Sequence, residues 1–279
     1  FLNKILTSVD KKYKYIKSTG ISFDTRSIKK GNIFFAIKGN KNSGKNFIDV
    51  AIKKKASCII IDQNIDKKKY KIPVIKVKNS RKSLSEACSN FYKKKPKNII
   101  AVTGTNGKSS VANFFFQIFF LNKLFSGSIG TLGIKTNTFK KNTNLTSLDP
   151  LLLHRNLFDL AKKKINNVII EASSHGLDQN RLDYIKFKTA IFTNFSHDHL
   201  DYHKNMKNYL KSKMYLFNSL LVKNSNVITE LNNKEFKKIK LIAYKNKLKL
   251  ITIGYQNSNL KIINHFYSEE NQILNFFYK

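Results

Sequence analysis

The stretch Val102-Thr-Gly-Thr-Asn-Gly-Lys-Ser-Ser110 decides how the rest of the chain is interpreted. The apolar residues 98–102 before it predict a buried parallel strand, and the apolar residues 111–120 after it predict a buried helix. A glycine turn between a strand and a helix can point its N–H groups at an anion, and the helix N-terminus adds its own. Lys108 can then reach the terminal phosphates of a nucleotide, while Ser109 offers a hydroxyl to Mg²⁺.

The loop departs from the strict phosphate-loop pattern at one position. That pattern has a glycine five residues before Gly107, where this chain has Val102. The match is therefore to a shorter variant, Thr-Gly-Thr-Asn-Gly-Lys-Ser. The alternative is a chance Gly-Lys-Ser in a surface turn, which the flanking strand and helix disfavour.

Composition limits the class of protein. The 279 residues suggest two domains, and a hydrophobic content of 41% favours a globular chain over a disordered one. The formal charge of +35 nominally favours nucleic-acid binding. However, the lysines are scattered along the whole chain, and Lys, Asn, Ile and Phe are over-used together while Trp is absent, which is typical of A/T-rich coding. We therefore expect no nucleic-acid partner.

Cysteine usage and hydropathy point to the cytoplasm. Cys58 and Cys88 are the only cysteines, and without metal-type spacing they predict buried apolar side chains in a reducing compartment. We find no apolar run that could span a bilayer and no signal peptide. We expect a cytoplasmic protein without a membrane partner.

The chain divides into two predicted α/β domains. Residues 1–95 predict a small α/β domain that ends in an amphipathic helix over 80–92, followed by a polar linker with Pro96. Residues 96–279 alternate strands and helices, which predicts a mostly parallel sheet covered by helices on both faces. Further expected elements are strands at 167–172 and 189–194, a helix at 206–221, and strands at 241–244, 248–254 and 260–263.

Two further stretches carry chemistry. Ser196-His-Asp-His-Leu-Asp-Tyr-His203 follows a predicted strand and concentrates three of the six histidines with two aspartates. Such a segment can bind a metal, move protons or orient a phosphate; a zinc site and a polar loop with incidental histidines are the alternatives. Glu171 is the charged residue at the end of a predicted apolar strand. A buried carboxylate needs a charge partner, and an Mg²⁺ ion bound to ATP would be one.

Taken together, these segments resemble the Mur ligases, ATP-dependent enzymes that add amino acids to a UDP-sugar peptide in cell-wall synthesis. Residues 103–110 resemble the family's Thr-Gly-Thr-Asn-Gly-Lys-Thr-Thr, with serines for the last threonines. Residues 171–181 (Glu-Ala-Ser-Ser-His-Gly-Leu-Asp-Gln-Asn-Arg) and 193–203 resemble segments of the branch that acts on UDP-MurNAc-L-Ala-D-Glu, and residues 24–39 resemble its uridine-binding N-terminal domain. The resemblance covers nearly all of the chain up to Phe217.

The resemblance implies a role for each site residue. Lys108, Lys213 and His199 would be catalytic, with Lys213 carbamylated, and the metal ligands would be Ser109, Glu171, His199 and the carbamylated Lys213. The residues implied around ATP are Gly104, Thr105, Asn106, Gly107, Lys108, Ser109, Ser110 and Asn194. Those implied around the UDP-sugar dipeptide are Thr25, Thr146, Ser147, Ser173, Gln179 and Arg181.

The implied reaction is ATP- and Mg²⁺-dependent amide ligation. The substrate glutamate attacks the γ-phosphate of ATP to give an acyl phosphate and ADP, and the amine of a diamino acid, meso-diaminopimelate by preference, then displaces phosphate. We expect domain 1–95 to bind the UDP-substrate and domain 96–279 to bind ATP, in a monomer that lacks the family's C-terminal amino-acid-binding domain and is an inactive fragment by itself. The alternatives are another Mur-type or folylpolyglutamate-type ligase, and a basic nucleic-acid-binding P-loop ATPase.

Overall fold

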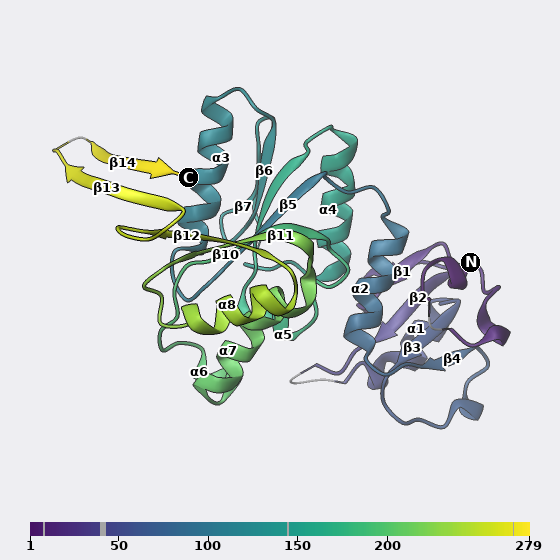
Figure 1. Cartoon of the computed structure of the whole chain (residues 1–279). Helices are drawn as coiled ribbons and strands as arrows, with labels where there is room; N and C mark the ends of the chain where they lie inside the picture. The colour runs from purple at the N-terminus through teal and green to yellow at the C-terminus, as the bar shows by residue number, and fades with distance from the viewer. Residues whose placement is uncertain (8, 40–42, 144, 270) are drawn as a thin grey trace. The chain divides into compact units, whose positions relative to one another are not determined.

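The computed structural model describes residues 1–7, 9–39, 43–143, 145–269 and 271–279, drawn in Figure 1. Its contacts divide the chain into two compact units. The first unit contains Phe1–Lys95, Asp149–Asp159 and Gln179–Tyr184, and the second contains Pro96–Leu148, Leu160–Asp178 and Ile185–Lys279. Two short segments beyond residue 95 therefore pack within the first unit, while a domain boundary at residue 95 stays a proposal.

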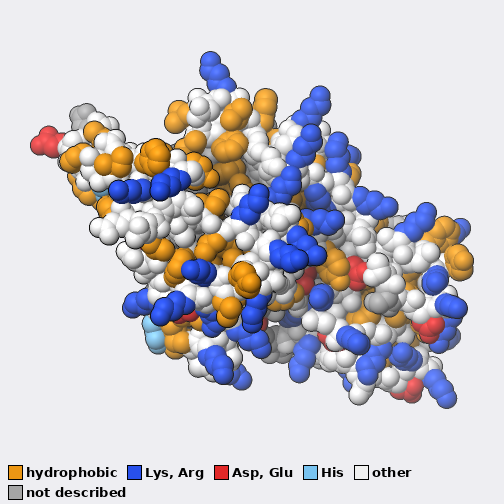
Figure 2. Space-filling model, in the orientation of Figure 1, with side chains coloured by type: hydrophobic (Ala, Val, Ile, Leu, Met, Phe, Trp, Pro, Cys, Tyr) orange, Lys and Arg blue, Asp and Glu red, His pale blue; other side chains and the backbone are white. Residues whose placement is uncertain are grey.

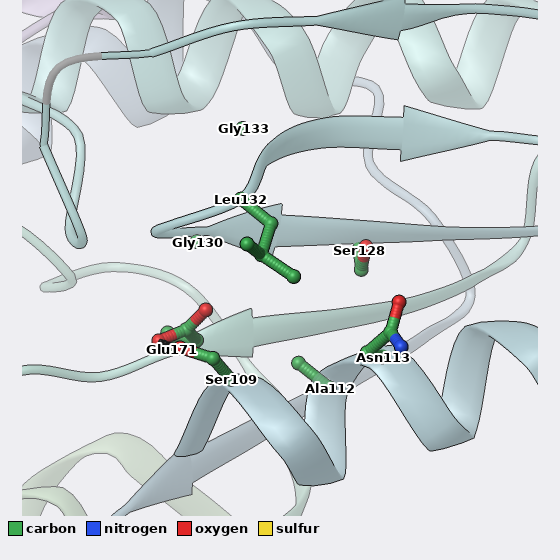
Figure 3. A pocket seen from close by; sticks show the side chains of 8 residues that line it. All are labelled: Ser109, Ala112, Asn113, Ser128, Gly130, Leu132, Gly133 and Glu171. Carbon is green, nitrogen blue, oxygen red and sulfur yellow. Dashed lines mark hydrogen bonds between the residues drawn. The ribbon is translucent and has the colours of Figure 1, made fainter.

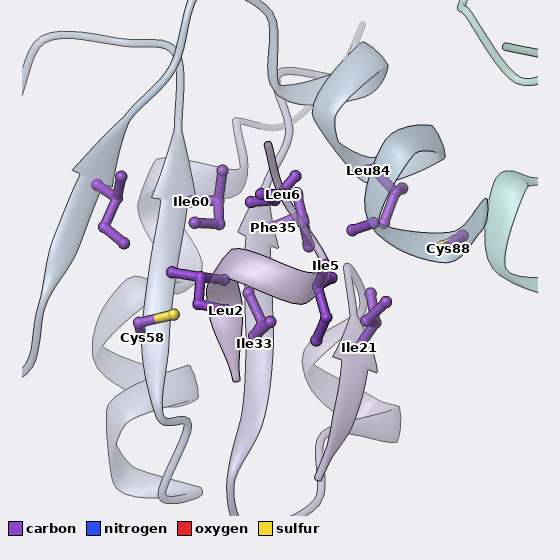
Figure 4. Packing of buried hydrophobic residues seen from close by; sticks show 12 residues of the cluster. Leu2, Ile5, Leu6, Ile21, Ile33, Phe35, Cys58, Ile60, Leu84 and Cys88 are labelled. Carbon is purple, nitrogen blue, oxygen red and sulfur yellow. The ribbon is translucent and has the colours of Figure 1, made fainter. Parts of the chain in front are cut away.

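The first unit is built on a four-stranded parallel sheet in the order β1-β2-β3-β4. Along β2, side chains alternate between two apolar clusters, because successive residues of a strand point to opposite faces. Ile33 and Phe35 join the cluster shown in Figure 4, whereas Phe34 and Ala36 join the other. Both cysteines are fully buried, as expected. The elements are β1 Gly20–Ser22, β2 Asn32–Ala36, β3 Cys58–Ile61, β4 Val74–Lys76, α1 Ile48–Lys53 and α2 Ser80–Phe91, with short 3₁₀ turns at Leu2–Lys4, Lys11–Tyr13, Thr25–Ser27, Gly44–Phe47 and Lys67–Lys69.

The second unit is built on a ten-stranded sheet in the order β14-β13-β12-β11-β10-β5-β9-β6-β7-β8. The strands from β13 to β6 pair in parallel, and the pairs β13–β14, β6–β7 and β7–β8 are antiparallel. This arrangement confirms the predicted α/β class with a mostly parallel sheet. The strands are β5 Asn98–Thr103, β6 Ser126–Gly130, β7 Gly133–Thr136, β8 Lys140–Lys141, β9 Asn167–Glu171, β10 Phe187–Phe192, β11 Leu221–Glu230, β12 Lys249–Gly254, β13 Leu260–Tyr267 and β14 Gln272–Tyr278.

Helices pack on the central strands of this sheet. Helix α3 contacts β5, β6 and β9, and Ala112 on α3 packs with Val102 and Ile169 in a small apolar cluster. Figure 1 shows the β13–β14 hairpin projecting beyond the other strands of its sheet. The helices are α3 Lys108–Leu121, α4 Pro150–Lys162, α5 Ser174–Asp178, α6 Leu200–His203, α7 Met206–Tyr215 and α8 Phe236–Lys245, and a π-helical turn, Leu216–Leu220, follows α7.

Three expectations differ from the structure. The helix expected to be buried over 111–120 is formed as α3, whose residues are all described, but Ala112 is its one buried residue, and Phe114, Ile118 and Phe120 are exposed. The segment 241–244 was expected to be a strand but lies inside α8, because Ile239, Ile242 and Ala243 recur at helical spacing and are buried while Tyr244 is exposed. The expected helix over 206–221 ends as a π-helical turn, and its last residue already begins β11. Among the described residues, no helix is long and apolar enough to cross a membrane.

Candidate functional site

The glycine loop between β5 and α3 has backbone angles that other residues rarely adopt. Gly104 has a φ of +150° and Gly107, which precedes the first residue of α3, has a φ of +83°. A Cβ on Gly104 would lie 1.9 Å from Thr193 Oγ1. The loop therefore needs glycine at Gly104 both for its conformation and for its close approach to Thr193, which directly follows β10.

The loop is hydrogen-bonded to the residues that follow β10, the parallel neighbour of β5. The Thr105 N–H donates to the Asn194 carbonyl at 3.0 Å, and the Asn106 N–H donates to Asn194 Oδ1 at 2.9 Å. Thr193 Oγ1 donates to the Asn106 carbonyl at 2.6 Å. The structure thus brings Asn194 to the loop, while Ser110 lies exposed in the first turn of α3.

Two lysines meet at one carbonyl oxygen of this loop. Lys108 Nζ donates to Gly104 O at 3.0 Å and to Thr105 O at 2.7 Å. Lys213 on α7 is 1% exposed, and its Nζ donates to the same Gly104 O at 2.6 Å. Burial, and secondly the charge of Lys108, lower the pKa of Lys213 to about 7. Lys213 therefore carries an amine that is partly neutral near pH 7.

Glu171, at the end of β9, is a buried carboxylate surrounded by hydroxyl and N–H donors. It is 2% exposed and accepts from Ser109 Oγ at 2.8 Å, from the Thr131 N–H at 2.9 Å and from Thr131 Oγ1 at 3.1 Å. A Cβ on Gly130 would lie 2.0 Å from Glu171 Oε1, so the carboxylate fills the space that this glycine leaves. Figure 3 shows Glu171 and Ser109 next to each other at a small pocket between α3 and the β6–β7 hairpin.

Three of the residues implied for the UDP-substrate lie around Glu171. Ser147 Oγ donates to the Glu171 carbonyl at 2.9 Å and accepts from the Ser173 N–H at 3.0 Å. The hydroxyls of Ser147 and Ser173 are also 2.9 Å apart, and Thr146 Oγ1 lies 3.0 Å from Thr131 Oγ1. These side chains place hydroxyl groups beside the end of β9.

The other three implied substrate residues belong to the first unit. The Thr25 carbonyl accepts from Lys54 Nζ at 2.8 Å. Gln179 Oε1 accepts from Arg181 Nη2 at 2.7 Å and from Arg81 Nη1 at 3.4 Å. These three residues lie in a different unit from Thr146, Ser147 and Ser173. That one substrate contacts residues of both units therefore stays a prediction.

The His-Asp segment forms an aromatic cluster around His199. His199 has a φ of +52° and directly precedes α6, and its Nε2 lies 3.4 Å from Asp198 Oδ2. The His175 ring on α5 packs edge-on against His199 with ring centroids 4.9 Å apart, and lies 4.2 Å from the Tyr202 ring. Within the described ranges, no three His, Cys, Asp or Glu side chains are grouped closely enough to hold a metal, so the zinc alternative has no support there.

Sequence reasoning missed two residues that join these parts. Thr131 supplies two of the donors to Glu171, and Tyr209 on α7 is fully buried beside both Thr105 and Lys213. The sequence contained a signal for Tyr209, because a residue four positions before Lys213 on a helix lies on the same face as Lys213. The position of Thr131 could be inferred only from its place directly after β6. Burial raises the pKa of Tyr209, so its hydroxyl stays protonated at neutral pH.

Two family models match the sequence. The model described as "Mur ligase middle domain" matches residues 102–278, and the one described as "Mur ligase family, catalytic domain" matches residues 17–92.

Curated relatives and a solved structure agree with these matches. The chain is 40% identical over 268 residues to the UDP-N-acetylmuramoyl-L-alanyl-D-glutamate--2,6-diaminopimelate ligase of Rickettsia montanensis, covering 93% of this chain and 54% of the relative. It is 41% identical over 206 residues to the same ligase of Bradyrhizobium diazoefficiens, covering 74% of this chain and 42% of the relative. A solved structure of a ligase of that name superimposes with a TM-score of 0.84 at 25% identity, covering 96% of this chain and 55% of the other. The chain spans about half the length of the curated relatives it matches.

Proposed function

The chain belongs to the Mur ligase family, and from that premise we propose that it carries the ATP site and the UDP-substrate site of a ligase that extends UDP-MurNAc-L-Ala-D-Glu with meso-diaminopimelate. The ligases it matches bear that name, and 40% identity over 93% of the chain supports the same substrates here. A cytoplasmic location, where ATP is available, is part of the same proposal.

The single observation that carries the proposal is the convergence on the glycine loop. Lys108 and Lys213 meet at Gly104 O, and Ser109 in the first turn of α3 donates to Glu171. These groups come from three elements, α3, α7 and β9, and supply two amines, a hydroxyl and a buried carboxylate. That set suits a magnesium-bound triphosphate, because the amine of Lys108 would neutralise phosphate oxygens and hard oxygen ligands suit Mg²⁺.

The residues present fit a magnesium ion. Ser109 Oγ and Glu171 are oxygen ligands 2.8 Å apart, and the carboxylate occupies a cradle that any side chain on Gly130 would fill. Within the described residues, the salt bridges do not include Glu171, so a cation would supply the charge partner that a buried carboxylate needs. His199 would be a further ligand. When bound, the ion would neutralise charge on the transferring phosphoryl group.

Lys213 would act as a carbamate. Carbon dioxide reacts with neutral amines, and a pKa of about 7 leaves a large neutral fraction of Lys213 at physiological pH. Addition of CO₂ to the neutral amine forms the N–C bond, releases one proton and leaves an anion beside Lys108. The carbamate would then pair with the cationic groups of the site and offer oxygen ligands to a second ion.

The protein's own part in the reaction would be positioning and charge neutralisation. Loop N–H groups and Lys108 would hold the triphosphate, and Thr146, Ser147 and Ser173 would orient the dipeptide end of the substrate beside Glu171. The substrate's glutamate carboxylate would attack the γ-phosphate, with ADP leaving. The diamino acid's amine would then attack the acyl carbon, forming the amide and releasing phosphate.

Calorimetric titration of this chain tests the proposal. We expect MgATP and UDP-MurNAc-L-Ala-D-Glu each to bind with little dependence on salt. Lys108→Met should weaken MgATP binding about 10- to 100-fold, because it removes charge-assisted hydrogen bonds worth about 1.5–3 kcal/mol. The exposed Lys211→Met on α7 is the matched control and should change affinity less than twofold.

The same titrations separate the alternatives. DNA binding that falls steeply as salt rises, with no binding of MgATP or of the UDP-sugar dipeptide, would favour the basic nucleic-acid-binding ATPase and refute the ligase. Binding of MgATP without the UDP-sugar dipeptide would instead favour a folylpolyglutamate-type or other Mur-type ligase.

A further inference from the structure

We infer that Tyr209 is a positioning residue that joins helix α7 to the glycine loop and so holds Lys213 and Thr105 in one arrangement. The inference rests on the proposed function, because it assigns Tyr209 a role in the binding of MgATP. Tyr209 is fully buried and lies four residues before Lys213 on α7, so both side chains extend from the same face of that helix.

The hydroxyl of Tyr209 is hydrogen-bonded to the loop. Tyr209 Oη lies 3.2 Å from Thr105 Oγ1. Thr105 Oγ1 gives its single proton to the Ser196 carbonyl at 3.3 Å and accepts from the Ser196 N–H at 3.0 Å. A threonine hydroxyl has one proton and two lone pairs, so Tyr209 is the donor whenever the Thr105 proton is on the Ser196 carbonyl. This bond links α7 to the loop in addition to the bond from Lys213 Nζ to Gly104 O, and Thr105 then links the loop to the His-Asp segment.

The ring of Tyr209 contacts the groups that the hydroxyl does not reach. Lys213 Nζ lies 4.4 Å from the ring centroid, within the range of a cation–π contact. The rings of His203 and His199 lie 5.2 Å and 5.9 Å away, centroid to centroid. The side chain therefore contacts the loop threonine, the buried lysine and both histidines at once.

These contacts distinguish Tyr209 from an ordinary core residue. A buried tyrosine usually finds some partner for its hydroxyl, and a partner in the protein interior would have no bearing on ligand binding. Here the partner is Thr105, whose N–H is also fixed by Asn194 and which directly precedes Asn106 and Gly107. Loss of the hydroxyl would free one side of the loop that meets the phosphates, while leaving the ring and its packing in place.

Tyr209→Phe tests the inference in this chain. We expect it to weaken MgATP binding about fivefold, the ratio that corresponds to one hydrogen bond of about 1 kcal/mol. Affinity for UDP-MurNAc-L-Ala-D-Glu should stay within twofold. Tyr244→Phe, on the 84% exposed Tyr244 of α8, is the matched control and should leave both affinities unchanged.

A double-mutant cycle with Thr105→Val isolates the bond between the two hydroxyls. In the Thr105→Val background the partner hydroxyl is already missing, so Tyr209→Phe should change MgATP affinity by less than twofold. The titrations are done well below each variant's melting temperature, so unfolded protein does not contribute to the measured affinities. If Tyr209 were purely structural, Tyr209→Phe would lower the melting temperature and leave the affinities unchanged.

The outcomes separate this inference from the proposed function. If the unchanged chain binds no MgATP, the proposed function and the role of Tyr209 both fail. If the unchanged chain binds MgATP and Tyr209→Phe binds it equally well, or if the two substitutions act additively, only the role of Tyr209 is overturned. A fivefold loss that disappears in the Thr105→Val background supports it.

Discussion

Gly130→Ala should displace Glu171 and so lower both the free energy of unfolding and the affinity for MgATP. A Cβ on Gly130 would lie 2.0, 2.4 and 2.5 Å from Oε1, Cδ and Cγ of Glu171. An ordinary contact begins at 3.4 Å, so the Oε1 atom would have to retreat by 3.4 − 2.0 = 1.4 Å. Glu171 is 2% exposed, which leaves it little space for that movement.

The magnitude follows from the bonds that this movement breaks. A retreat of this size would take Glu171 out of reach of Ser109 Oγ, now 2.8 Å away, and strain its two bonds from Thr131. Hydrogen bonds to a charged acceptor contribute about 1.5–3 kcal/mol each, and partial relaxation recovers some of the loss. We therefore expect the free energy of unfolding to fall by about 3 kcal/mol and MgATP affinity to fall about 100-fold.

Gly127→Ala is the matched control, because Gly127 lies on the same strand, β6. Its added Cβ would meet only ordinary contacts, the nearest at 3.5 Å. Urea unfolding should place this variant within about 1 kcal/mol of the unchanged protein, since alanine is entropically favoured over glycine in a strand. Equal unfolding free energies and equal MgATP affinities for the two variants would refute this role of the Glu171 carboxylate.

Three further predictions concern buried side chains. The folded-state pKa of Lys213, about 7, lies below the unfolded value near 10.5, so the unfolded chain binds more protons between these pH values. The free energy of unfolding should therefore rise with pH in this range, by up to about 1.4 kcal/mol per pH unit. Urea unfolding of Lys213→Met should lack this part of the rise. Burial lowers the pKa of His154 to about 3, so protonation of the unfolded chain should reduce stability as pH falls below about 6.5, and His154→Leu should show a shallower loss between pH 6.5 and 4 than the unchanged chain. Phe35→Ala should lower the free energy of unfolding by about 3–5 kcal/mol, because Phe35 is fully buried in β2; a loss below 1 kcal/mol would contradict its place in the core.

The strand, glycine turn and helix proposed to bind phosphate were predictable because their signal is local. Residues 98–110 contain an apolar run, two glycines and Lys108 in sequence order. The run predicts a strand, the glycines predict a tight turn, and Gly-Lys-Ser predicts the start of a helix. The structure has a strand and a helix on either side of that turn. Glu171 could also be placed near it, because parallel strands end at one edge of the sheet.

The parts that could not be predicted depend on long-range packing. Residues 241–244 have strand-like composition, and only the burial of Ile239 and Ile242 on one helix face reveals α8. Strand β11 carries exposed lysine and asparagine residues at its start, which hides it from hydropathy, yet it pairs with β10 and β12. The contact between Tyr209 and Thr105 spans 104 positions of sequence, so no local pattern records it.

The carbonyl oxygen of Gly104 receives both Lys108 and Lys213, and this sharing has a consequence for selectivity. Before a ligand binds, and while Lys213 carries no carbamate, the protonated fraction of Lys213 is repelled by Lys108 at this fixed point of the folded chain. Binding of a polyanion relieves that repulsion, whereas an uncharged ligand of the same shape gains no binding free energy from it. If the proposed function holds, we therefore expect discrimination between nucleoside and nucleotide to begin with the electrostatics of this loop.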